Sequence, residues 1–495
     1  MASASSAPAP LPPVTFHIPF FGHAHGSPSG HRGCCADINA ITEHAGVKHL
    51  FKQSGGVEDP TSKGLGFGFA HYISDDFVRW KYLSTIVTPG GADGSLSFGL
   101  PGGPVILWDC GDEEACMPSR DIGLAAGGCK SGDRAIIGVA RPANASDPTL
   151  EHWVKDAKNP IVVHQGSGLA SCYAGPSNLW VSSDKKTTYL EMIFNKTTGL
   201  FKSTDLDLHS WDLVNGDFYA TRGGGGGLFF ALPRPASSPL GDVLSYSHML
   251  QSDFPGHADG TAFYALGSYD EAKGTFTGVS NEPRALDFSE NFVYNQLGTR
   301  ADGTMVNVGW IRNMGTSVVR DVSYDLALGG QLLAYPVPEL TTLRTAVLGS
   351  TGGKNVTLPS TTNTSIVASG ATAADMDLVF GIAPQGLEVT VTALGFAVDL
   401  TVQAGGSNAT LRVSSAAGSC LGSFPLPPGL EQIALRLLVD GVSIEAFAAE
   451  GRGVCSFADI VAPIQSAVVV TAGSLPVTLL NATVWKMGAI LDGES

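Results

Sequence analysis

The chain has 495 residues, which is too long for one small domain and suits two. It contains 62 glycines and 29 prolines but only 15% charged residues, against about 25% in typical domains, and this composition is typical of all-β proteins with many tight turns. The formal net charge of −16 argues against a nucleic acid partner, because binding to phosphate requires a basic surface; it fits either a neutral substrate or a solvated acidic surface.

Residues 1–13 are rich in Ala, Ser and Pro, and this composition predicts a disordered tail. They lack the basic and apolar regions of a signal peptide, so we do not interpret them as one. No run of 18 or more apolar residues occurs, so we expect no membrane partner. Six N-x-[ST] motifs nevertheless favour a secreted or vacuolar protein, and the compartment therefore stays open. These glycosylation motifs begin at Asn144, Asn195, Asn355, Asn363, Asn408 and Asn481.

Short apolar runs separated by Gly, Asp and Asn turns extend from Val14 to about Ala334, without a long helical periodicity. About 320 residues of such strands are compatible with a large sandwich or with a propeller of about five to seven blades. One internal similarity links Ser74–Trp80 to Ser203–Trp211, since both place Ser, Asp and then Trp at a strand–turn–strand junction. A Trp packed on the core is the simpler interpretation, and a Trp that stacks on sugar is the alternative.

The segment Pro336–Leu348 has apolar residues near helical spacing and predicts a connecting helix in a linker of residues 336–352. Alternating strands resume in residues 353–495, and about 135 residues of this pattern are the size of a β-sandwich.

Eight cysteines are present but no C-x-x-C motif, so a zinc ribbon or a thioredoxin-type site is not predicted. Cys420 and Cys455 are the only cysteines of the C-terminal part and predict a disulfide, with two buried thiols as the alternative. His17 and three further histidines before Cys34 are irregularly spaced in a Gly-rich segment, which favours a loop over a tetrahedral metal site. We therefore expect no metal and no cofactor.

The stretch Cys34–Gln53 contains the main candidate for chemistry. Asp37 lies in a turn of small residues, and the alternating run His49–Gln53 predicts a strand that enters the core. We expect this strand to hold the Asp37 carboxylate at the mouth of a β-structure.

Several segments, in chain order and with matched gaps, resemble motifs of glycoside hydrolase family 32, which comprises invertases, inulinases, levanases and fructan exohydrolases. These segments are Phe16–Pro19, Ala36–Ala40 with His49–Gln53, Phe69–Trp80, Ser97–Gly99, Ser146–Ile161, Gly267–Asp270, Leu286–Phe288, Gly309–Ile311, Leu332–Val337 and Leu435–Arg452. The resemblance covers nearly the whole chain from Phe16 to about Pro463. It implies a five-bladed β-propeller over residues 14–335, followed by a β-sandwich over residues 353–495.

The resemblance also implies β-fructofuranosidase activity on a small sugar such as sucrose or a fructan. Retaining hydrolysis of this kind uses two carboxylates about 5–5.5 Å apart, one as nucleophile and one as general acid/base. Asp37 matches the nucleophile of the family's N-D-P-N-G motif. The family's transition-state stabiliser and acid/base fall at Gly175 and Gly224, so both catalytic positions are degenerate, and loss of a general acid typically lowers a rate by about 10²–10⁴.

Candidates for a replacement acid and for a sugar pocket can also be named for a chain with this fold. Candidates for a surrogate acid are Glu290, Asp287, Asp121 and Glu191, of which Glu191 is expected at a partly solvated strand position. Positions that could line a sugar pocket are Asn39, Gln53, Phe69, Ser97 and Asp287. Asp440 and Glu445 are expected to hold the sandwich to the propeller rather than to contact sugar.

Two functions remain open from the sequence. The first is an enzyme that cleaves β-fructofuranosides with Asp37 as nucleophile and another acid. The second is a catalytically inactive homologue that binds sugar or acts as a scaffold. The two glycines favour the second function, and the retained surroundings of Asp37, His71 and Asp287 favour a surviving pocket.

Overall fold

The computed structural model consists almost entirely of β-strands joined by turns, so the predicted all-β fold class is confirmed. Its helical segments within the described ranges are the short 3₁₀ helices η3 (Pro338–Leu343) and η4 (Ala449–Gly451). In these ranges no helix has the length and apolar character needed to cross a membrane. The structure describes residues 17, 37–55, 67–90, 94–109, 134–165, 176–194, 197–219, 227–231, 246–251, 262–278, 284–312, 314–325, 327–328, 331–367, 373–393, 395–459 and 468–490.

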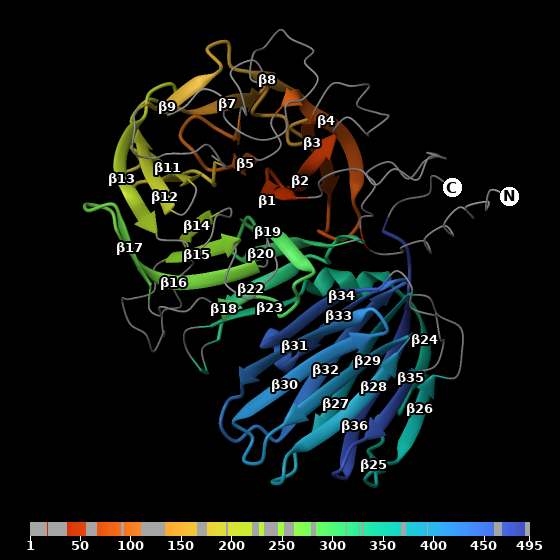
Figure 1. Cartoon of the computed structure of the whole chain (residues 1–495). Coiled ribbons are helices and arrows are strands. Elements are labelled where there is room, and N and C mark those ends of the chain that lie inside the picture. The colour runs from red at the N-terminus through yellow and green to blue at the C-terminus, as the bar shows by residue number, and fades with distance from the viewer. Residues whose placement is uncertain are drawn as a thin grey trace, which may run out of the picture.

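The first part of the chain forms five small antiparallel sheets, sheets 1 to 5, which follow one another along the sequence (Figure 1). Sheet 1 contains β1 (Ile38–His44), β2 (Val47–Gly55), β3 (Phe67–Ser74) and β4 (Lys81–Gly90). Sheet 2 contains β5 (Gly94–Ser97), β6 (Val105–Asp109), β7 (Arg134–Pro142), β8 (Trp153–Lys155) and β9 (Ile161–Gln165). Sheet 3 contains β10 (Trp180–Val181), β11 (Thr188–Phe194), β12 (Thr197–Ser203) and β13 (Asp212–Tyr219).

Sheets 4 and 5 complete this part of the molecule. Sheet 4 contains β14 (Gly227–Ala231), β15 (Tyr246–Gln251), β16 (Ala262–Asp270), β17 (Thr275–Gly278) and β18 (Arg284–Ala285). Sheet 5 contains β19 (Phe292–Thr299), β20 (Met305–Ile311), β21 (Gly315–Thr316), β22 (Arg320–Tyr324) and β23 (Leu332–Pro336).

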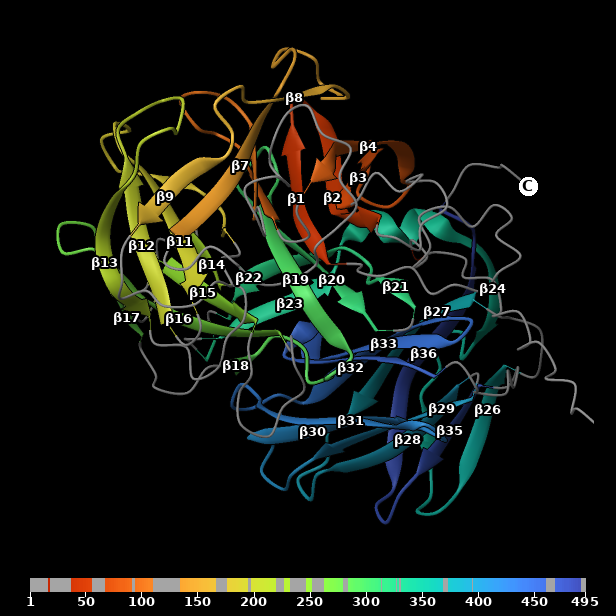
Figure 2. The ribbon, with the colours of Figure 1, turned by 45° about the horizontal axis from the view of Figure 1, so that its top comes forward.

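Sheet 5 contacts sheet 1 where β19 lies beside β1 (Figure 2). Gly298 lies so close to the Ile41 carbonyl that an added Cβ would collide with it, and Thr42 Oγ1 donates a hydrogen bond to the Thr299 carbonyl at 3.4 Å. Since residue 41 lies beside 298 and residue 42 beside 299, the two strands run in the same direction. The start of β1, next to Asp37, therefore lies at the same end as the start of β19.

The turn noticed in the sequence recurs in sheets 1, 2 and 3. In each, an Asp carboxylate accepts a hydrogen bond from the backbone N–H two residues later, at 2.9–3.0 Å, and an apolar residue with positive φ precedes a Trp by three residues. The acidic residues are Asp76, Asp147 and Asp205, and the tryptophans are Trp80, Trp153 and Trp211. Trp80 is buried in an apolar cluster, and the half-buried rings of Trp153 and Trp211 pack against such clusters. The prediction that Trp80 and Trp211 pack on the core is therefore confirmed.

The C-terminal part consists of two larger sheets that share one apolar core. Sheet 6 contains β24 (Arg344–Ser350), β25 (Val356–Leu358), β27 (Ala373–Gly381), β32 (Gln432–Asp440), β33 (Ser443–Ala448), β34 (Gly453–Ala458) and β36 (Val477–Met487). Sheet 7 contains β26 (Asn363–Val367), β28 (Leu387–Ala393), β29 (Phe396–Val402), β30 (Asn408–Ser415), β31 (Gly418–Pro425) and β35 (Val468–Ala472). A disulfide between Cys420 and Cys455 joins β31 to β34, so this predicted pairing is confirmed.

The connecting helix predicted for Pro336–Leu348 is wrong beyond Leu343. Only Pro338–Leu343 is helical, with Leu340 and Leu343 buried, and the chain then continues as β24. Arg344 explains the change, because its side chain is paired with Asp375 and stacks 3.6 Å from the Trp485 ring centroid while its backbone joins sheet 6. Val347, expected on the buried face of a helix, is 60% exposed.

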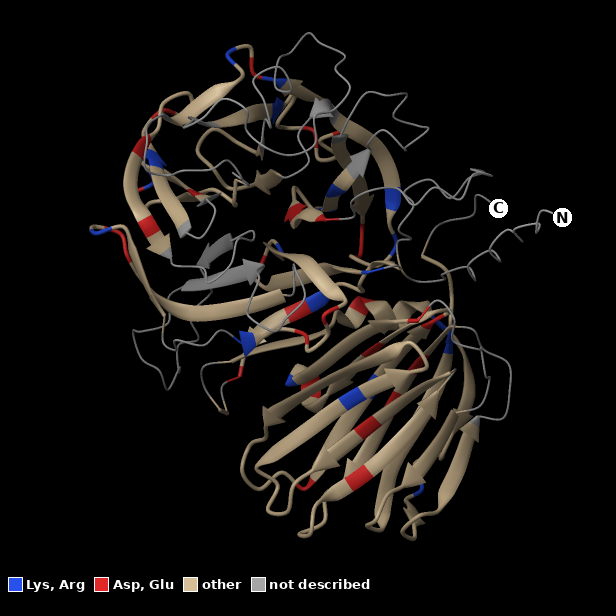
Figure 3. Cartoon of the chain, viewed as in Figure 1, with Lys and Arg blue, Asp and Glu red and all other residues tan. Residues whose placement is uncertain are grey.

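Charged residues are interspersed over both parts of the molecule. Figure 3 shows Asp and Glu on strands and turns of the small and large sheets, with Lys and Arg between them. The net negative charge is therefore spread over many elements of the described chain rather than confined to one.

Candidate functional site

Asp37 lies directly before β1 and is half-buried. Its backbone carbonyl accepts a hydrogen bond from the Gln53 N–H at 2.8 Å, and β1 pairs with β2 from Ile38 opposite Lys52 onwards. The predicted relation between Asp37 and the strand that contains His49–Gln53 is thus confirmed. The pairing fixes the Asp37 backbone at the end of sheet 1 that adjoins sheet 5.

Two of the predicted pocket residues lie next to Asp37 in these strands. Asn39 is buried, and its Nδ2 donates to the Gly94 carbonyl of sheet 2 at 2.9 Å, while its Oδ1 accepts no hydrogen bond from a described residue. Gln53 is also buried and lies opposite Phe69 in the pairing of β2 with β3. Asp37, Asn39 and Gln53 are therefore brought together by two paired strands.

Phe69 and Ser97 occupy the contacts between sheets. Phe69 is completely buried in the apolar cluster that also contains Phe51 and Trp108, so its ring faces the core rather than an open surface. Ser97 Oγ accepts a hydrogen bond from the Leu179 N–H at 2.7 Å, which ties sheet 2 to the chain that enters sheet 3. Both side chains thereby fix the relative positions of neighbouring sheets.

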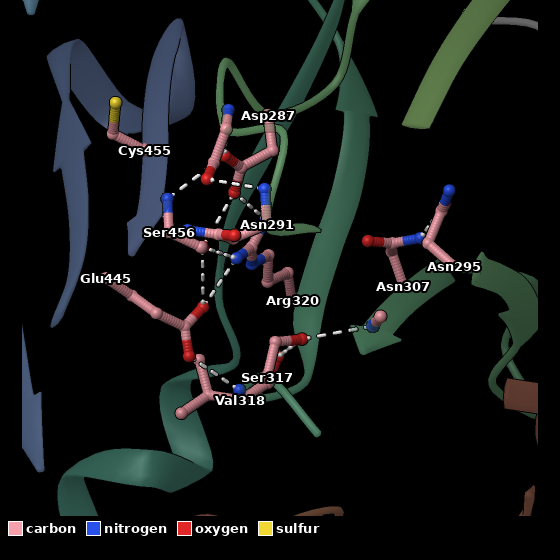
Figure 4. A network of polar contacts seen from close by, with 12 residues as sticks. Asp287, Asn291, Asn295, Asn307, Ser317, Val318, Arg320, Glu445, Cys455 and Ser456 are labelled. Carbon is pink, nitrogen blue, oxygen red and sulfur yellow. Dashed lines mark hydrogen bonds and ion pairs between the residues drawn. The ribbon is translucent and has the colours of Figure 1, made fainter. Parts of the chain in front are cut away.

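Asp287 lies elsewhere, in a polar network between sheet 5 and sheet 6 (Figure 4). Its Oδ2 accepts from Arg320 Nη1 at 3.0 Å and from Ser456 Oγ at 2.7 Å, and its Oδ1 accepts from the backbone N–H of Ser289 and of Ser456 at 3.0 Å. The expectation that Asp287 binds sugar is corrected accordingly: these four donors hold a carboxylate that is fully buried. The same contacts remove it as a surrogate acid.

Arg320 is the centre of this network. It is completely buried, and its Nη2 donates to Glu445 Oε2 and to Ser456 Oγ, both at 2.5 Å. Its guanidinium lies 4.3 Å from the ring centroid of Phe292 and 5.1 Å from that of Phe447. Glu445 also accepts from the Val318 N–H at 2.8 Å, so the prediction that it holds the two parts together is confirmed.

His17 completes the network from the N-terminal side. Its Nδ1 lies 2.8 Å from Asp440 Oδ2 and its Nε2 lies 2.8 Å from Glu445 Oε1, so both ring nitrogens donate and the imidazole is protonated. Burial opposes this charge, but the two hydrogen bonds and the two carboxylate charges raise the pKa of His17 to about 9. Burial would raise the pKa of Glu445, but the Arg320 and His17 charges lower it. His17 is therefore a structural cation rather than part of a metal site.

Burial lowers the pKa of three basic side chains in β2 and β3, which favours their neutral forms. His49 and His71 lie with Nδ1 and Nε2 3.0 Å apart, and burial lowers their pKa values to about 4 and about 3. Burial also lowers the pKa of Lys52 to about 8, and its Nζ lies 5.5 Å from the Tyr72 ring centroid. Within the described ranges, no group of three or more His, Cys, Asp or Glu side chains is arranged to hold a metal ion.

The other candidates for a surrogate acid differ in their exposure to solvent. Glu191 is completely buried, which corrects the expectation of a partly solvated position; the reason is that β11 is an interior strand of sheet 3, between β10 and β12. Glu290 is exposed in the turn before β19. Asp121, Gly175 and Gly224 lie outside the described residues.

One aromatic pair in sheet 5 was not predicted from the sequence. Tyr294 and Trp310 are half-buried at the paired ends of β19 and β20, and their rings stack with centroids 6.0 Å apart at 20°. Tyr294 has a φ of 46° at an irregularity in the pairing of the two strands, which turns it out of the regular ladder. The parallel run of β1 and β19 brings this end of sheet 5 to the Asp37 end of sheet 1. The motif Gly309–Ile311 was the available signal, but it was used only as a marker of the fold.

Comparisons with known proteins identify the family of the chain. Residues 28–325 match the family model described as the glycosyl hydrolases family 32 N-terminal domain. The chain is 26% identical over 357 residues to an acid beta-fructofuranosidase of Solanum lycopersicum, covering 62% of this chain and 50% of the relative. It is 24% identical over 376 residues to a beta-fructofuranosidase, insoluble isoenzyme, of Arabidopsis thaliana, covering 69% and 64% respectively. The match thus spans about half to two thirds of the length of these relatives.

Solved structures resemble the whole chain. Fructan 1-exohydrolase IIa from Cichorium intybus superposes with a TM-score of 0.73 at 20% identity, covering 97% of this chain and 98% of that one. The exo-inulinase from Aspergillus awamori gives a TM-score of 0.70 at 16% identity, covering 96% and 98%. At these identities the similarity establishes the fold.

Proposed function

The chain belongs to glycoside hydrolase family 32, and from this premise we propose that it hydrolyses β-fructofuranosides, such as sucrose or fructans, at Asp37. The observation that carries the proposal is the position of Asp37, held by β2 at the end of sheet 1 that faces sheet 5. The beta-fructofuranosidases among its relatives support the substrate class.

The proposal includes the finer architecture. Sheets 1 to 5 would be the blades of a five-bladed propeller over residues 14–335, since each contacts its neighbour and sheet 5 contacts sheet 1. Sheets 6 and 7, which share one core, would be a β-sandwich that begins with β24 at Arg344, before the expected boundary at residue 353. The connection is then shorter than the expected 336–352 and consists mainly of η3. Asp37 would then lie at one end of the propeller's central channel.

In the proposed mechanism Asp37 is the nucleophile. Its carboxylate attacks the anomeric C2 of the fructosyl unit, the glycosidic C–O bond breaks, and the leaving oxygen takes up a proton. Water then attacks C2 of the fructosyl–Asp37 ester, the C2–O bond to Asp37 breaks, and one proton of the water returns to the group that protonated the leaving oxygen. This step releases fructose with its original configuration and restores the carboxylate. With glycines at 175 and 224, the proton must come from another acid. Fructosyl cations form readily, which lowers the demand on that acid.

The neighbouring polar and aromatic groups suit a sugar. The amides of Asn39 and Gln53 offer hydrogen-bond donors and acceptors for hydroxyl groups, and the half-buried Tyr294–Trp310 pair offers an aromatic surface. We assign Ser97 and Phe69 a supporting role, because they join the sheets that carry Asn39 and Gln53.

A second candidate function is sugar binding without cleavage. The glycines at 175 and 224 favour it, because the resemblance predicts that they occupy the positions of the family's stabilising carboxylate and general acid. In this case Asp37 would accept hydrogen bonds from sugar hydroxyls instead of attacking C2.

One experiment separates the two functions. Purified protein is incubated with sucrose, inulin and levan, fructose release is measured, and sugar binding is followed by calorimetry. Asp37→Ala is the test variant, and Asp399→Ala in β29 of sheet 7, where Asp399 accepts from Thr390 Oγ1 at 2.7 Å, is the matched control.

Fructose release that disappears in Asp37→Ala and persists in Asp399→Ala is the result we expect for the enzyme. Binding without release in the unmodified protein would establish the second function. Release that persists in Asp37→Ala would refute the proposed nucleophile, and neither release nor binding would refute both functions.

A further inference from the structure

Glu191 is a side chain of β11 that ends in a carboxyl group and is completely buried. It lies beside the chain that enters β10, because the Ser177 N–H donates to the Glu191 carbonyl at 2.9 Å and Pro176 forms a β-bridge with Met192. Glutamate is rarely buried completely, since removal of a carboxyl group from water is costly. The position of this side chain relative to Asp37 decides what it can do.

Hydrogen bonds between sheets place Glu191 at the Asp37 end of sheets 1 to 3. Asn39 Nδ2 donates to the carbonyl of the residue before Ser95 at 2.9 Å, and Ser95 Oγ donates to the Ser177 carbonyl at 2.7 Å. Asn39, Ser95 and Ser177 therefore lie at one level, and Ser177 is bonded to Glu191. Since Asp37 comes two residues before Asn39, Glu191 lies close to the level of the nucleophile.

The Glu191 side chain points towards sheet 4, because successive side chains of a strand point to opposite faces. Leu190 and Met192, on one face of β11, pack in a cluster with residues of sheet 2. Tyr189, on the other face, packs in a cluster with Ala265 of sheet 4. Glu191 shares the face of Tyr189, and β11 contacts β14, the first strand of sheet 4 (Figure 1). The carboxyl group thus lies between sheets 3 and 4.

The resemblance assigns the family's acid/base to Gly224, three residues before β14 begins at Gly227. Glycine has no side chain with which to protonate a leaving group, but a carboxyl group on β11 that faces β14 can supply the proton from the neighbouring strand. We propose that Glu191 is the general acid/base of the reaction at Asp37. This assignment rests on the proposed hydrolysis of β-fructofuranosides.

Both steps of the reaction then balance with water as the only co-reactant. The Glu191 carboxyl donates its proton to the glycosidic oxygen as the bond from C2 to this oxygen breaks and the bond from C2 to Asp37 forms. The Glu191 carboxylate next takes one proton from water, whose oxygen attacks C2 as the bond from C2 to Asp37 breaks. Burial keeps bulk water from the Glu191 proton, and the sugar approaches it from the Asp37 end of the sheets.

The test compares two substrates whose leaving groups differ in their need for a proton. Sucrose loses an alcohol, which must be protonated, whereas β-fructofuranosyl fluoride loses a fluoride ion, which requires no general acid. Glu191→Gln keeps the size of the side chain but removes its acidic proton, and Glu290→Gln changes the competing candidate, which is exposed. Release of fructose and of fluoride is measured with and without azide, and circular dichroism checks that each variant folds.

We expect Glu191→Gln to cleave sucrose about 10²–10⁴-fold more slowly than the unmodified protein, but to release fluoride in its first turnover within about tenfold of the unmodified rate. Azide attacks C2 without a general base, so it should accelerate this variant and yield fructosyl azide with the original configuration. Glu290→Gln should behave like the unmodified protein, and Asp37→Ala should lose both activities.

Unchanged cleavage of sucrose by Glu191→Gln would overturn the assignment, as would equal losses on both substrates without an effect of azide in a folded variant. Release of fluoride, but no cleavage of sucrose, by the unmodified protein would also overturn it and would leave Asp37 as the nucleophile. Release from neither substrate by the unmodified protein would refute the proposed hydrolysis and this assignment with it. If Glu191→Gln does not fold, Glu191→Met, which suits the apolar neighbours in β11, is judged by the same criteria.

Discussion

Substitution of Arg320 tests the network between sheets 5 and 6. Arg320→Met keeps much of the side-chain volume but removes the cation that pairs with Asp287 and Glu445 in a site without solvent exposure. Removal of one partner from a buried ion pair typically costs about 3–5 kcal/mol, because a charge is left buried without compensation. Here both carboxylates keep other donors, since Asp287 retains Ser456 and Glu445 retains His17. We therefore expect a loss of about 3 kcal/mol in the free energy of unfolding.

Arg436→Met is the matched control. Arg436 is also almost completely buried, and its Nη2 lies 2.8 Å from Asp375 Oδ2. Asp375 keeps a second cation when Arg436 is removed, because Arg344 Nε donates to it at 2.8 Å. We expect this variant to lose about half as much stability as Arg320→Met, or less.

Urea unfolding followed by tryptophan fluorescence and by circular dichroism measures both variants. Agreement of the two probes decides whether the molecule unfolds in one step, and each transition is analysed separately if they differ. The double variant Arg320→Met/Glu445→Gln should recover part of the loss, since it removes one of the uncompensated charges. A loss below about 1 kcal/mol for Arg320→Met, or a loss equal to that of Arg436→Met, would refute the argument from buried charge.

Two further outcomes follow from the same part of the structure. The folded-state pKa of His17 is raised from 6.5 to about 9 by Asp440 and Glu445, so its contribution of about 3 kcal/mol is complete below pH 6.5 and disappears as the pH rises through 9. The urea midpoint of the unmodified protein should fall over this pH range, and that of His17→Gln should fall less; equal slopes would contradict the assignment. Replacement of Cys420 and Cys455, 35 residues apart, by Ser should lower the free energy of unfolding by about 4 kcal/mol, and an unchanged urea midpoint in this variant would contradict a stabilising role for the disulfide.

Local patterns in the sequence were sufficient for much of the fold. Alternating apolar residues identified β2, and the Ser-Asp-Trp turns identified repeated junctions, because both depend on side chains within about ten residues of each other. The pairing of Cys420 with Cys455 could be predicted because the C-terminal part offers no other cysteine.

The predictions that were wrong concern residues whose contacts in the fold are far away in the sequence. Arg344 enters a strand because Asp375 and Trp485 lie beside it, and neither is close in sequence. Asp287 belongs to the network around Arg320 rather than to a sugar site, and the Ser456 that fixes it comes 169 residues later. Apolar periodicity does not contain such information.

The contact between β1 and β19 has a consequence for how the molecule loses its structure. In a solenoid, each repeat touches only its sequence neighbours, so terminal repeats can fray independently. Here sheets 1 and 5, the first and the last of the small sheets, contact each other through Ile41 and Gly298. Each of them therefore has a neighbouring sheet on both sides. Local opening of either sheet exposes apolar surface on both, so the five sheets should melt as one cooperative unit, and loss of sheet 1 should destabilise a segment 250 residues away.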